Sequence, residues 1–587
     1  MRIVVREEIS EDSELRRSWN GLVLRLQRPE VFYTYEWAIA VQRAYGSSRS
    51  PLILLAYDDD SLVGLAALAR RTKGEVVFLT ADTADYCDFL SGEDIRDEFI
   101  AVVFAELRKM DVSKVILTNL PADSPSRQAI SRAAAQFLYR IHQRVAYQCA
   151  RVVFPSSEAR AEVKKNLLAK KRLRRNMREM QKIAPVRIQH DTTWPEIELS
   201  LQPFMRTHVV RFLEMGKTSS IVHEERRIFL RELAQELSRS GWVALSRFLV
   251  GDDTAAWHFG FRFAGSWFWY QPTLNRAFGD FSPGYCLLAK IIEQACDSPD
   301  LELVDLGLGA EGYKERFTTG SRETLYCELN RSLPAHIRTV VRHRVAQALT
   351  ASPAVENRIR GLMAHLASFK VRLRASGLRN SLSWTARRLA HAVVASEDVL
   401  FFQWPADARV PLAHGLRLVP LDSDLIGAAA IYYGEDPAAL RYLTRCAQRL
   451  ESENTQGFAL LTANDTPVHF CWVRDFEGFD MAELDRRLQA PCPDAVMLFD
   501  CYTPVSTRGH GYFSEAIALA AVALRAAGKS PWIFGAAANH SSVRGIQKSA
   551  FEYRFTLGRR RIAFFSQRKD SIPEPQPAKR ATSVTAA

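Results

Sequence analysis

The order of secondary structure repeats within the first 330 residues, and this repeat constrains the fold of the 587-residue chain more than any other feature. In the first half, apolar segments at 51–57 and 62–68 flank the turn Asp58-Asp59-Asp60, which predicts a hairpin. A helix over 98–110 then leads to a strand at 114–118. The order is therefore strand, turn, strand, helix, strand.

The second half shows the same order with different residues. Strands are expected at 242–250, 255–263 and 267–270, separated by tight turns. A helix follows Pro283-Gly284 and a further strand covers 301–306. Two halves with one order predict two copies of one α/β architecture, each a mixed, mostly antiparallel sheet flanked by helices.

The rest of the chain divides by composition. Residues 165–183 are rich in Lys and Arg, with apolar positions three and four apart, and predict one basic helix that connects the halves. Three α/β units are predicted, at 1–155, 156–330 and 398–570. An Arg- and Ala-rich helical connector at 331–397 precedes the third unit, and a Pro-rich, disordered tail at 571–587 follows it.

Charge and cysteine usage narrow the expected partners and compartment. The net charge of +12 favours anionic partners such as coenzyme A, nucleotides, lipid headgroups or nucleic acid, although a basic run is also compatible with a solvated helix face. The nine cysteines form no CxxC pair and no zinc-spaced cluster with histidine, so neither a metal nor a disulfide framework is expected. No leader peptide and no run of about 18 apolar residues is found. We therefore expect a cytoplasmic protein, and peripheral contact with the inner membrane stays open.

A glycine-bearing turn opens a helix near the C-terminus. The turn Arg508-Gly509-His510-Gly511 follows an apolar strand and precedes an amphipathic helix expected over 513–524. Such a turn exposes backbone N–H groups beside the positive end of the helix dipole, which suits a pyrophosphate. A plain strand-to-helix turn is the alternative.

This C-terminal block resembles the GNAT acetyltransferase superfamily. The family's acyl-CoA turn reads Arg/Gln-x-x-Gly-x-Gly/Ala, which Arg508 and Gly511 match and Phe513 does not. A second family mark, an Asn before a short helix and a Gly-Phe, is met by Asn539 and Phe551, with Ala550 in place of the glycine. The resemblance implies acyl-CoA as co-substrate, bound by the following residues: Arg508, Gly509, His510, Gly511, Tyr512 and Asn539.

The first 330 residues resemble the CelD-type (BioF-like) acetyltransferase family. Four segments together carry this resemblance: Phe32 to Trp37, Asp85-Tyr86-Cys87-Asp88-Phe89-Leu90, Phe281-Ser282-Pro283-Gly284, and the segment after Asp305. The last contains the family's hallmark, Gly309-Ala310-Glu311-Gly312-Tyr313-Lys314, completed by Phe317. The family is associated with cellulose and exopolysaccharide synthesis and is akin to the FemAB-type transferases, which carry two GNAT-like folds in one chain. The resemblance therefore implies tandem GNAT-like folds, in agreement with the repeated order.

Three residues are candidates for catalysis. Acyl transfer passes through a tetrahedral oxyanion, and the resemblance implies that Lys314 stabilises it. Glu311 is expected to orient Lys314 or act as a base, and a salt bridge is the alternative. His258 lies on an apolar strand, either as a base with a pKa near working pH or as a core histidine. Ser282 and Gly284 lie where the donor's phosphates would bind, although they also fit an ordinary helix start.

The combined expectation is an N-acyltransferase that moves an acyl group, most simply acetyl, from acyl-CoA to an amine such as an amino sugar in exopolysaccharide or cellulose synthesis. Two alternatives stay open. One is FemAB-like aminoacyl transfer from charged tRNA, for which the basic helix would suit RNA. The other is a non-catalytic accessory protein, in peripheral contact with a membrane polysaccharide synthase. Fold analogy does not choose among them.

Overall fold

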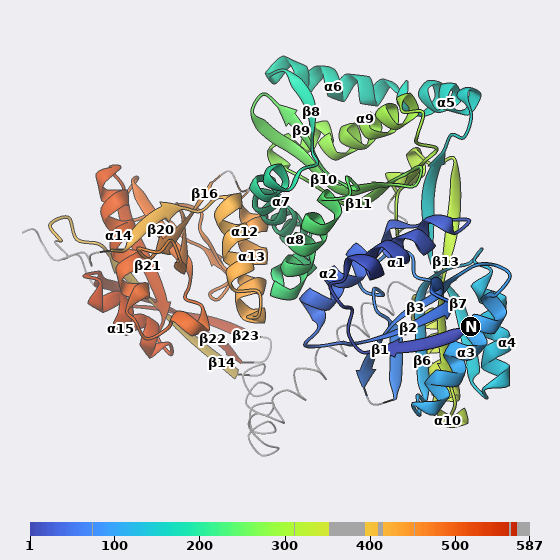
Figure 1. Ribbon diagram of the computed structural model, residues 1–587. Helices are drawn as coiled ribbons and strands as arrows, with labels where there is room; N and C mark the ends of the chain where they lie inside the picture. The colour runs from blue at the N-terminus through green and yellow to red at the C-terminus, as the bar shows by residue number, and fades with distance from the viewer. Residues whose placement is uncertain are drawn as a thin grey trace, which may run out of the picture. The chain divides into compact units, whose positions relative to one another are not determined.

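The structure is a computed structural model that describes residues 1–72, 74–309, 312–350, 394–408, 415–450, 452, 454–562 and 565–571. The chain divides into two compact units. The first comprises Met1–Phe212 and Thr218–Pro353, and the second comprises Leu213–Lys217 and Ala354–Ala587. Figure 1 colours the first unit from blue to yellow-green and most of the second in orange to red.

The first unit is built on one 13-stranded sheet with the order β1-β2-β3-β4-β6-β13-β7-β12-β11-β10-β9-β8, and β5 pairs β3. Its strands are β1 (Arg2–Arg6), β2 (Ser50–Asp58), β3 (Ser61–Thr72), β4 (Glu75–Phe78), β5 (Leu90–Ser91), β6 (Lys114–Pro121), β7 (Arg140–Val153), β8 (Val186–Asp191), β9 (Val243–Val250), β10 (Asp253–Phe263), β11 (Ser266–Leu274), β12 (Leu303–Asp305) and β13 (Gly320–Asn330).

The sheet confirms the repeated order. In the first half β1 to β4 are antiparallel neighbours and β4 pairs β6 in parallel. In the second half β8 to β11 are antiparallel neighbours and β11 pairs β12 in parallel. A helix joins each parallel pair, α3 (Arg96–Lys109) in the first half and α9 (Pro283–Asp297) in the second. The two halves therefore repeat one topology.

The halves are joined by two strands that the sequence did not predict. β13, from the end of the second half, pairs β6 of the first half, and β7, from the end of the first half, pairs β12 of the second. β7 and β13 also pair with each other over eleven positions. The predicted boundary at 155 therefore separates two halves in sequence, but both belong to one compact unit with one sheet.

Each parallel pair is short. β4 and β6 pair at three positions, and β11 and β12 also pair at three, from Ser266↔Leu303 to Phe268↔Asp305. Beyond Asp305 the chain leaves the sheet while β11 continues to Leu274. The neighbouring strands separate at this point, so the loop after β12 lies beside the end of β11.

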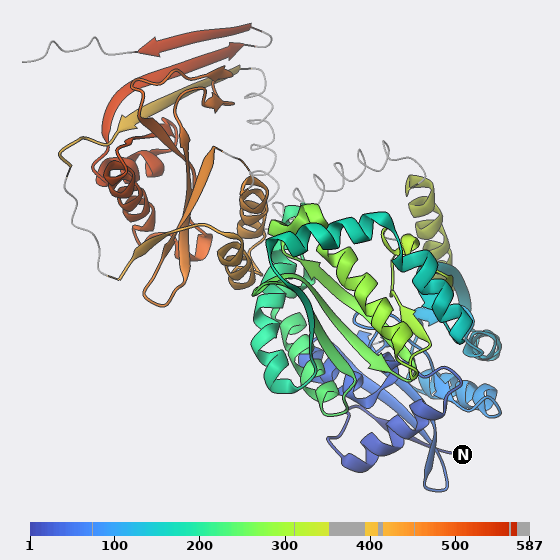
Figure 2. The same cartoon turned by 90° about the horizontal axis from the view of Figure 1, so that it is seen from above.

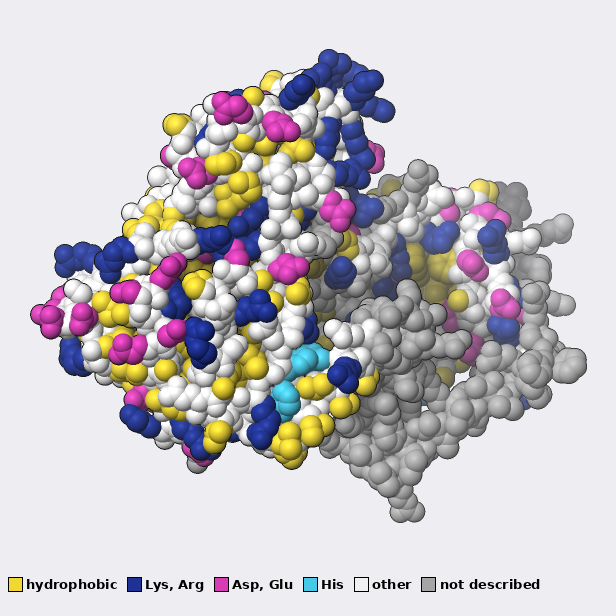
Figure 3. Space-filling view, turned by 90° about the vertical axis from the view of Figure 1, so that its right-hand side faces the viewer, with side chains coloured by type: hydrophobic (Ala, Val, Ile, Leu, Met, Phe, Trp, Pro, Cys, Tyr) yellow, Lys and Arg dark blue, Asp and Glu magenta, His cyan; other side chains and the backbone are white. Residues whose placement is uncertain are grey.

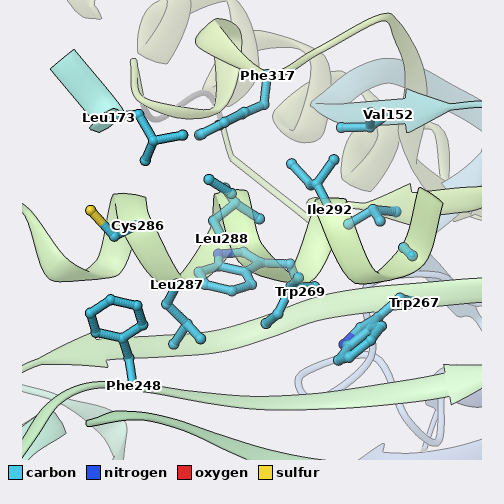
Figure 4. Packing of buried hydrophobic residues seen from close by; sticks show 14 of the residues in the cluster. Val152, Leu173, Phe248, Trp267, Trp269, Cys286, Leu287, Leu288, Ile292 and Phe317 are labelled. Atoms are coloured by element: carbon cyan, nitrogen blue, oxygen red, sulfur yellow. The ribbon is translucent and has the colours of Figure 1, made fainter. Parts of the chain in front are cut away.

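Helices cover both faces of the sheet (Figure 2). The further helices of this unit are α1 (Ser13–Arg25), η1 (Val31–Tyr33), α2 (Tyr35–Tyr45), α4 (Ser126–Gln136), α5 (Ser157–Val163), η2 (Lys164–Leu168), α6 (Lys171–Ile183), α7 (Trp194–Glu214), η3 (Ser220–Val222), α8 (Glu224–Ser238), η4 (Arg276–Phe281), η5 (Lys314–Arg316) and α10 (Leu333–Thr350). Helix α9 lies between the sheet and α6 in the core of the second half: Leu287 faces the strands, and Cys286 faces Leu173 of α6 (Figure 4).

Two predicted helical segments differ from the structure. The basic segment is not one helix, because a turn of π-helix (η2) ends at Leu168 and α6 starts at Lys171 after extended backbone at Lys170. Of the predicted connector, 333–350 form α10, residues 351–393 lie outside the described residues, and a strand already begins at Val394. The predicted tail beyond residue 571 also lies outside the described residues.

The second unit contains the third copy of the topology. Its eight-stranded sheet has the order β15-β16-β17-β20-β21-β14-β22-β23, and β20 and β21 form the parallel pair. The elements are β14 (Val394–Gln403), β15 (Arg417–Pro420), α12 (Ser423–Tyr432), α13 (Pro437–Arg449), β16 (Thr455–Leu461), β17 (Pro467–Asp475), β18 (Asp480–Met481), β19 (Arg486–Arg487), β20 (Ala495–Tyr502), η6 (Val505–Thr507), α14 (Tyr512–Ala526), β21 (Ser530–Ala536), α15 (His540–Lys548), β22 (Glu552–Ile562) and β23 (Phe565–Ser571). In the described part of the chain, no helix is long and apolar enough to cross a bilayer.

Candidate active site

A cavity of ≈ 540 Å³ opens in the first unit where its two halves meet. Both halves contribute to its wall. The lining residues are Ala81, Asp82, Thr83, Ala84, Asp85, Thr118, Asn119, Arg144, Ala146, Tyr147, Arg226, Tyr270, Gln271, Leu308 and Tyr326. The cavity therefore depends on the sheet that β7 and β13 hold together.

Asp85 is the acidic group in this cavity whose pKa is displaced. Burial, and next the negative charge of Asp305, raise the pKa of Asp85 to about 7, against a lowering by the nearby Lys314 cation. Its carboxylate lies against Gly307, where a Cβ atom would come within 2.5 Å of Oδ2. A carboxyl that titrates near neutral pH in a cavity is suited to accept a proton.

Lys314 lies close to the same end of the cavity. Its side chain is only 5% exposed and its ammonium donates a hydrogen bond to the carbonyl of Leu308, at 2.8 Å. Leu308 lines the cavity, and the charge of Lys314 is felt by Asp85. Lys314 was predicted from the sequence as a catalytic residue, and Asp85 was not. The structure places the two side chains close enough for their charges to interact.

The loop that carries these groups is anchored by Asp305 at the end of β12. Its fully buried carboxylate accepts hydrogen bonds from the Tyr86 hydroxyl at 2.8 Å, from Arg151 Nε at 2.9 Å and from the Gly307 N–H at 2.9 Å. Tyr86 belongs to the first half, Arg151 to β7 and Gly307 to the second half. A single carboxylate thus fixes the loop to both halves.

Two further polar groups face the cavity from the second half. Arg226 of α8 donates to the hydroxyl of Tyr270 at 2.8 Å, and that hydroxyl donates to the carbonyl of Thr83. Burial raises the pKa of Tyr270 to about 12, so the phenol stays protonated at neutral pH. Thr118 and Gln271 also line the cavity, and their buried atoms Thr118 Oγ1 and Gln271 Oε1 make no hydrogen bond within the described residues.

His258 takes the place of a core residue. It lies in β10, is fully buried, and stacks on Trp269 with ring centroids 4.1 Å apart. Burial, with the neighbouring His190, lowers its pKa to about 3, so the imidazole is neutral, and it does not line the cavity. The interpretation of His258 as a general base is therefore replaced by the core-histidine alternative.

The remaining predicted site residues of the first unit are Glu311, Ser282 and Gly284. Glu311 lies outside the described residues. Ser282 precedes α9 with a left-handed backbone (φ 52°) and makes no side-chain cap, and Gly284 lies in the first turn of that helix. The Arg172 guanidinium of α6 lies 3.5 Å from Ser282 Oγ. The start of α9 thus carries an adjacent cation.

The predicted glycine turn lies in the second unit at the start of α14. Gly509 and Gly511 both have positive φ (88° and 79°), so each adopts backbone that glycine tolerates without strain. Arg508 donates from Nε to the carbonyl of Thr503 at 3.1 Å, and the exposed His510 ring stacks on Tyr512.

Asn539 caps the other helix of this region. Its side-chain oxygen accepts from the Ser542 N–H at the start of α15. This capping role is sufficient to explain an Asn at the position. Ala550, which stands where the resembled family has glycine, has φ 67° and is therefore a strained alanine.

Asp85 and Arg226 were assigned no role in the site from the sequence. A usable signal was present in the segment Asp85-Tyr86-Cys87-Asp88, where acids interrupt an apolar stretch between strands. Arg226 carried no comparable signal, because it lies on a separate helix that only the fold brings to the cavity.

Comparison with known families finds a match over one part of the first unit. The model of a family described as "Acetyltransferase (GNAT) domain" matches residues 169–315. This segment is a GNAT domain. It starts just before α6, includes the whole second half of the sheet up to β12, and ends one residue after Lys314. The match supports acyl transfer as the general activity. Within the described residues, no cluster of His, Cys, Asp and Glu could hold a metal ion.

Solved structures with similar folds are distant in sequence. FemX is 8% identical with a TM-score of 0.41 over 58% of this chain and 100% of its own. A conserved protein of unknown function from Bacteroides thetaiotaomicron is 10% identical, with a TM-score of 0.40 over 56% and 100%. A tandem GNAT protein from the clavulanic acid biosynthesis pathway is 12% identical, with a TM-score of 0.33 over 56% and 98%. No curated protein matches the chain.

Proposed function

We propose that the protein is an N-acyltransferase that transfers an acyl group, with acetyl as the expected group, from acyl-CoA to an amine held in the cavity of the first unit. The observation that carries the proposal is Asp85, a carboxyl with a pKa of about 7 in a ≈ 540 Å³ cavity, next to the end of the GNAT domain. An amine acceptor must lose a proton during transfer, and Asp85 is placed to receive it.

The reaction assigns a role to each group. The amine nitrogen attacks the thioester carbonyl, a C–N bond forms, and the C–S bond breaks to release the CoA thiolate. Asp85 takes the proton that leaves the nitrogen. Lys314, close to the same end of the cavity, offsets the negative charge that develops on the carbonyl oxygen. The remaining gain comes from holding the two substrates together.

The donor's phosphates are assigned to the start of α9, because the GNAT match includes this helix and Arg172 lies beside Ser282. The turn at Arg508 to Tyr512 in the second unit stays a proposed second site for acyl-CoA.

The acceptor is proposed to be polar. The polar residues Thr118, Asn119 and Gln271 line the cavity, and Tyr270 stays protonated among them. An amino sugar, as the resemblance to the CelD-type family implies, has the amine and the hydroxyl groups that such a cavity would recognise. A role in polysaccharide synthesis, with contact to a synthase, is part of this proposal.

The test is an acyl-transfer assay on the full chain with acetyl-CoA and a panel of amines that includes glucosamine, in which release of the CoA thiol is followed. We expect Asp85→Asn and Lys314→Ala each to lower turnover about 10²-fold or more. Asp82→Asn is the matched control, because Asp82 lines the same cavity but pairs with Arg49 and Arg71. Full activity of Asp85→Asn, or transfer only from charged tRNA, would contradict the proposal.

A further inference from the structure

A groove of ≈ 440 Å³ lies on the outer side of α9, between this helix and α6, and does not belong to the cavity that contains Asp85. Its floor is apolar: Leu168, Ala169 and Met177 are partly exposed there, and Leu173 of α6 and Cys286 and Ala289 of α9 are buried beside them. Figure 4 shows Cys286 pointing from α9 toward Leu173, on the side of the helix away from the strands. The groove therefore presents hydrocarbon surface at its base.

The rim of the groove is strongly basic. Lys164, Arg174, Arg178 and Lys290 stand around it. Lys164 pairs with Asp297 and Lys290 with Glu293, whereas Arg174 and Arg178 make no ion pair within the described residues and are exposed. Two guanidinium groups thus stand uncompensated above an apolar floor.

The residues around the groove are also rich in positive charge. Residues 164–182 contain nine Lys and Arg against one acid, Glu179, which pairs with Lys182. Lys and Arg side chains gather at the top of the molecule in Figure 3. Ile183, the last residue of α6, is 57% exposed, so an apolar side chain stands at the end of the basic helix. Polybasic helices with neighbouring apolar side chains are typical of protein surfaces that bind anionic lipid.

The composition of the groove favours a lipid over RNA. Sequence-tolerant RNA binding combines cations with aromatic side chains on which bases stack, and no aromatic residue lines this groove. A phospholipid instead joins a phosphate to hydrocarbon, which matches cations above an apolar floor. The basic rim is therefore complementary to the phosphate of a phospholipid, and the apolar floor is complementary to its hydrocarbon.

We propose that the α6–α9 groove docks the protein on the surface of an anionic phospholipid bilayer. Phosphates pair with Arg174 and Arg178, and hydrocarbon of the interface enters the groove over the partly exposed Leu168 and Met177. This inference is independent of the proposed acyl transfer. Docking would hold the enzyme where membrane-bound acceptors are presented.

The experiment is co-sedimentation of the full chain with vesicles of phosphatidylcholine alone or of phosphatidylcholine mixed with phosphatidylglycerol, at low and high salt. We expect binding to the anionic vesicles to be at least about 10-fold tighter and to weaken as salt is raised. The double reversal Arg174→Glu/Arg178→Glu should lose about 10-fold or more of this binding.

The matched control is Arg108→Glu/Lys548→Glu, which changes the net charge equally at exposed positions of α3 and α15. It should bind the anionic vesicles as tightly as the unchanged chain. If its binding falls as much as that of the groove variant, net charge alone explains the loss, and the groove is not the docking site. Met177→Gln, which makes a partly exposed part of the floor polar without altering charge, should weaken the binding that persists at high salt. Equal binding to both vesicle types, no vesicle binding, or binding of an RNA oligonucleotide in place of vesicles would each overturn the proposal.

Discussion

At the scale of single residues, position in the fold decides which ionisable groups are useful. Asp85 and Glu30 are both acids whose pKa burial raises to about 7, but Glu30 is paired with Arg322 at 2.6 Å and Asp85 faces a cavity. Burial has the opposite effect on the histidine: it lowers the pKa of His258 to about 3, so the imidazole stays neutral near neutral pH. A perturbed pKa points to function only where a substrate can reach the group.

The pKa of Asp85 predicts how activity depends on pH. The base must be ionised, so kcat/KM should rise as pH increases through about 7 and level off above it. In Asp85→Asn the remaining activity should lack this rise. A pH–rate profile of both proteins checks the prediction. An unchanged rise in the variant would assign the titration to another group.

Ala550 predicts a stabilising substitution. Its φ of 67° is left-handed backbone that costs an alanine about 1–2 kcal/mol relative to glycine. Ala550→Gly should therefore raise the free energy of unfolding by about 0.5–1 kcal/mol in urea denaturation, after the greater freedom of glycine in the unfolded chain is subtracted. Ala527→Gly is the control, because its φ is −85° and it should not gain stability. Equal effects at the two positions would contradict the explanation.

At the scale of elements, the loop after β12 does most to shape the site. It begins at Asp305, which Tyr86 and Arg151 hold, and it continues to Lys314. Gly307 in this loop has φ 70° and lies against Asp85. The loop therefore sets both the position of Lys314 and the space available to the Asp85 carboxylate.

Gly307→Ala tests this dependence. The new Cβ would lie 2.5 Å from Asp85 Oδ2 and 3.2 Å from the Trp269 carbonyl, on backbone that alanine disfavours. We expect a loss of stability of about 1–2 kcal/mol, measured by thermal denaturation, together with a loss of turnover similar to that of Asp85→Asn. Gly279→Ala, whose Cβ would meet nothing nearer than Arg276 Cγ at 3.8 Å, should change neither. Normal turnover in Gly307→Ala would show that the loop tolerates displacement.

At the scale of the whole molecule, three copies of one topology are organised in two ways. In the first two copies, β7 of the first pairs with β12 of the second, and β13 of the second pairs with β6 of the first, so the two form one sheet. The third copy has its own sheet in the second unit. Because the candidate cavity is lined from both of the first two copies, neither of these copies alone contains the site.

The shared sheet predicts how the first unit tolerates truncation. A chain of residues 1–155 would keep β7 but lose both of its partners, β12 and β13. It should fail to fold, because unpaired strand edges and an uncovered core would face water. A chain of residues 1–331 should instead unfold in one cooperative transition, followed by circular dichroism. Independent folding of 1–155 would contradict the inferred coupling.

Local pattern in the sequence determined much of this architecture. Apolar strands between tight turns, such as 51–57 and 242–250, and amphipathic helices such as 98–110 match β2, β9 and α3, because burial of one face imposes a local period. The repeated order followed from these elements. The motif from Gly309 to Lys314 also indicated Lys314, since it lies within one continuous segment.

Tertiary structure decided what local pattern does not encode. β7 and β13 are rich in polar residues and have no clear alternation, so only their pairing with each other and with both halves makes them strands. The same pairing brings Asp85 next to Lys314, more than two hundred residues later in the chain. The sequence by itself therefore determined the repeated elements and the acyl-transfer motif, whereas the fold decided which acid faces the cavity, because long-range contacts set burial and charge around each group.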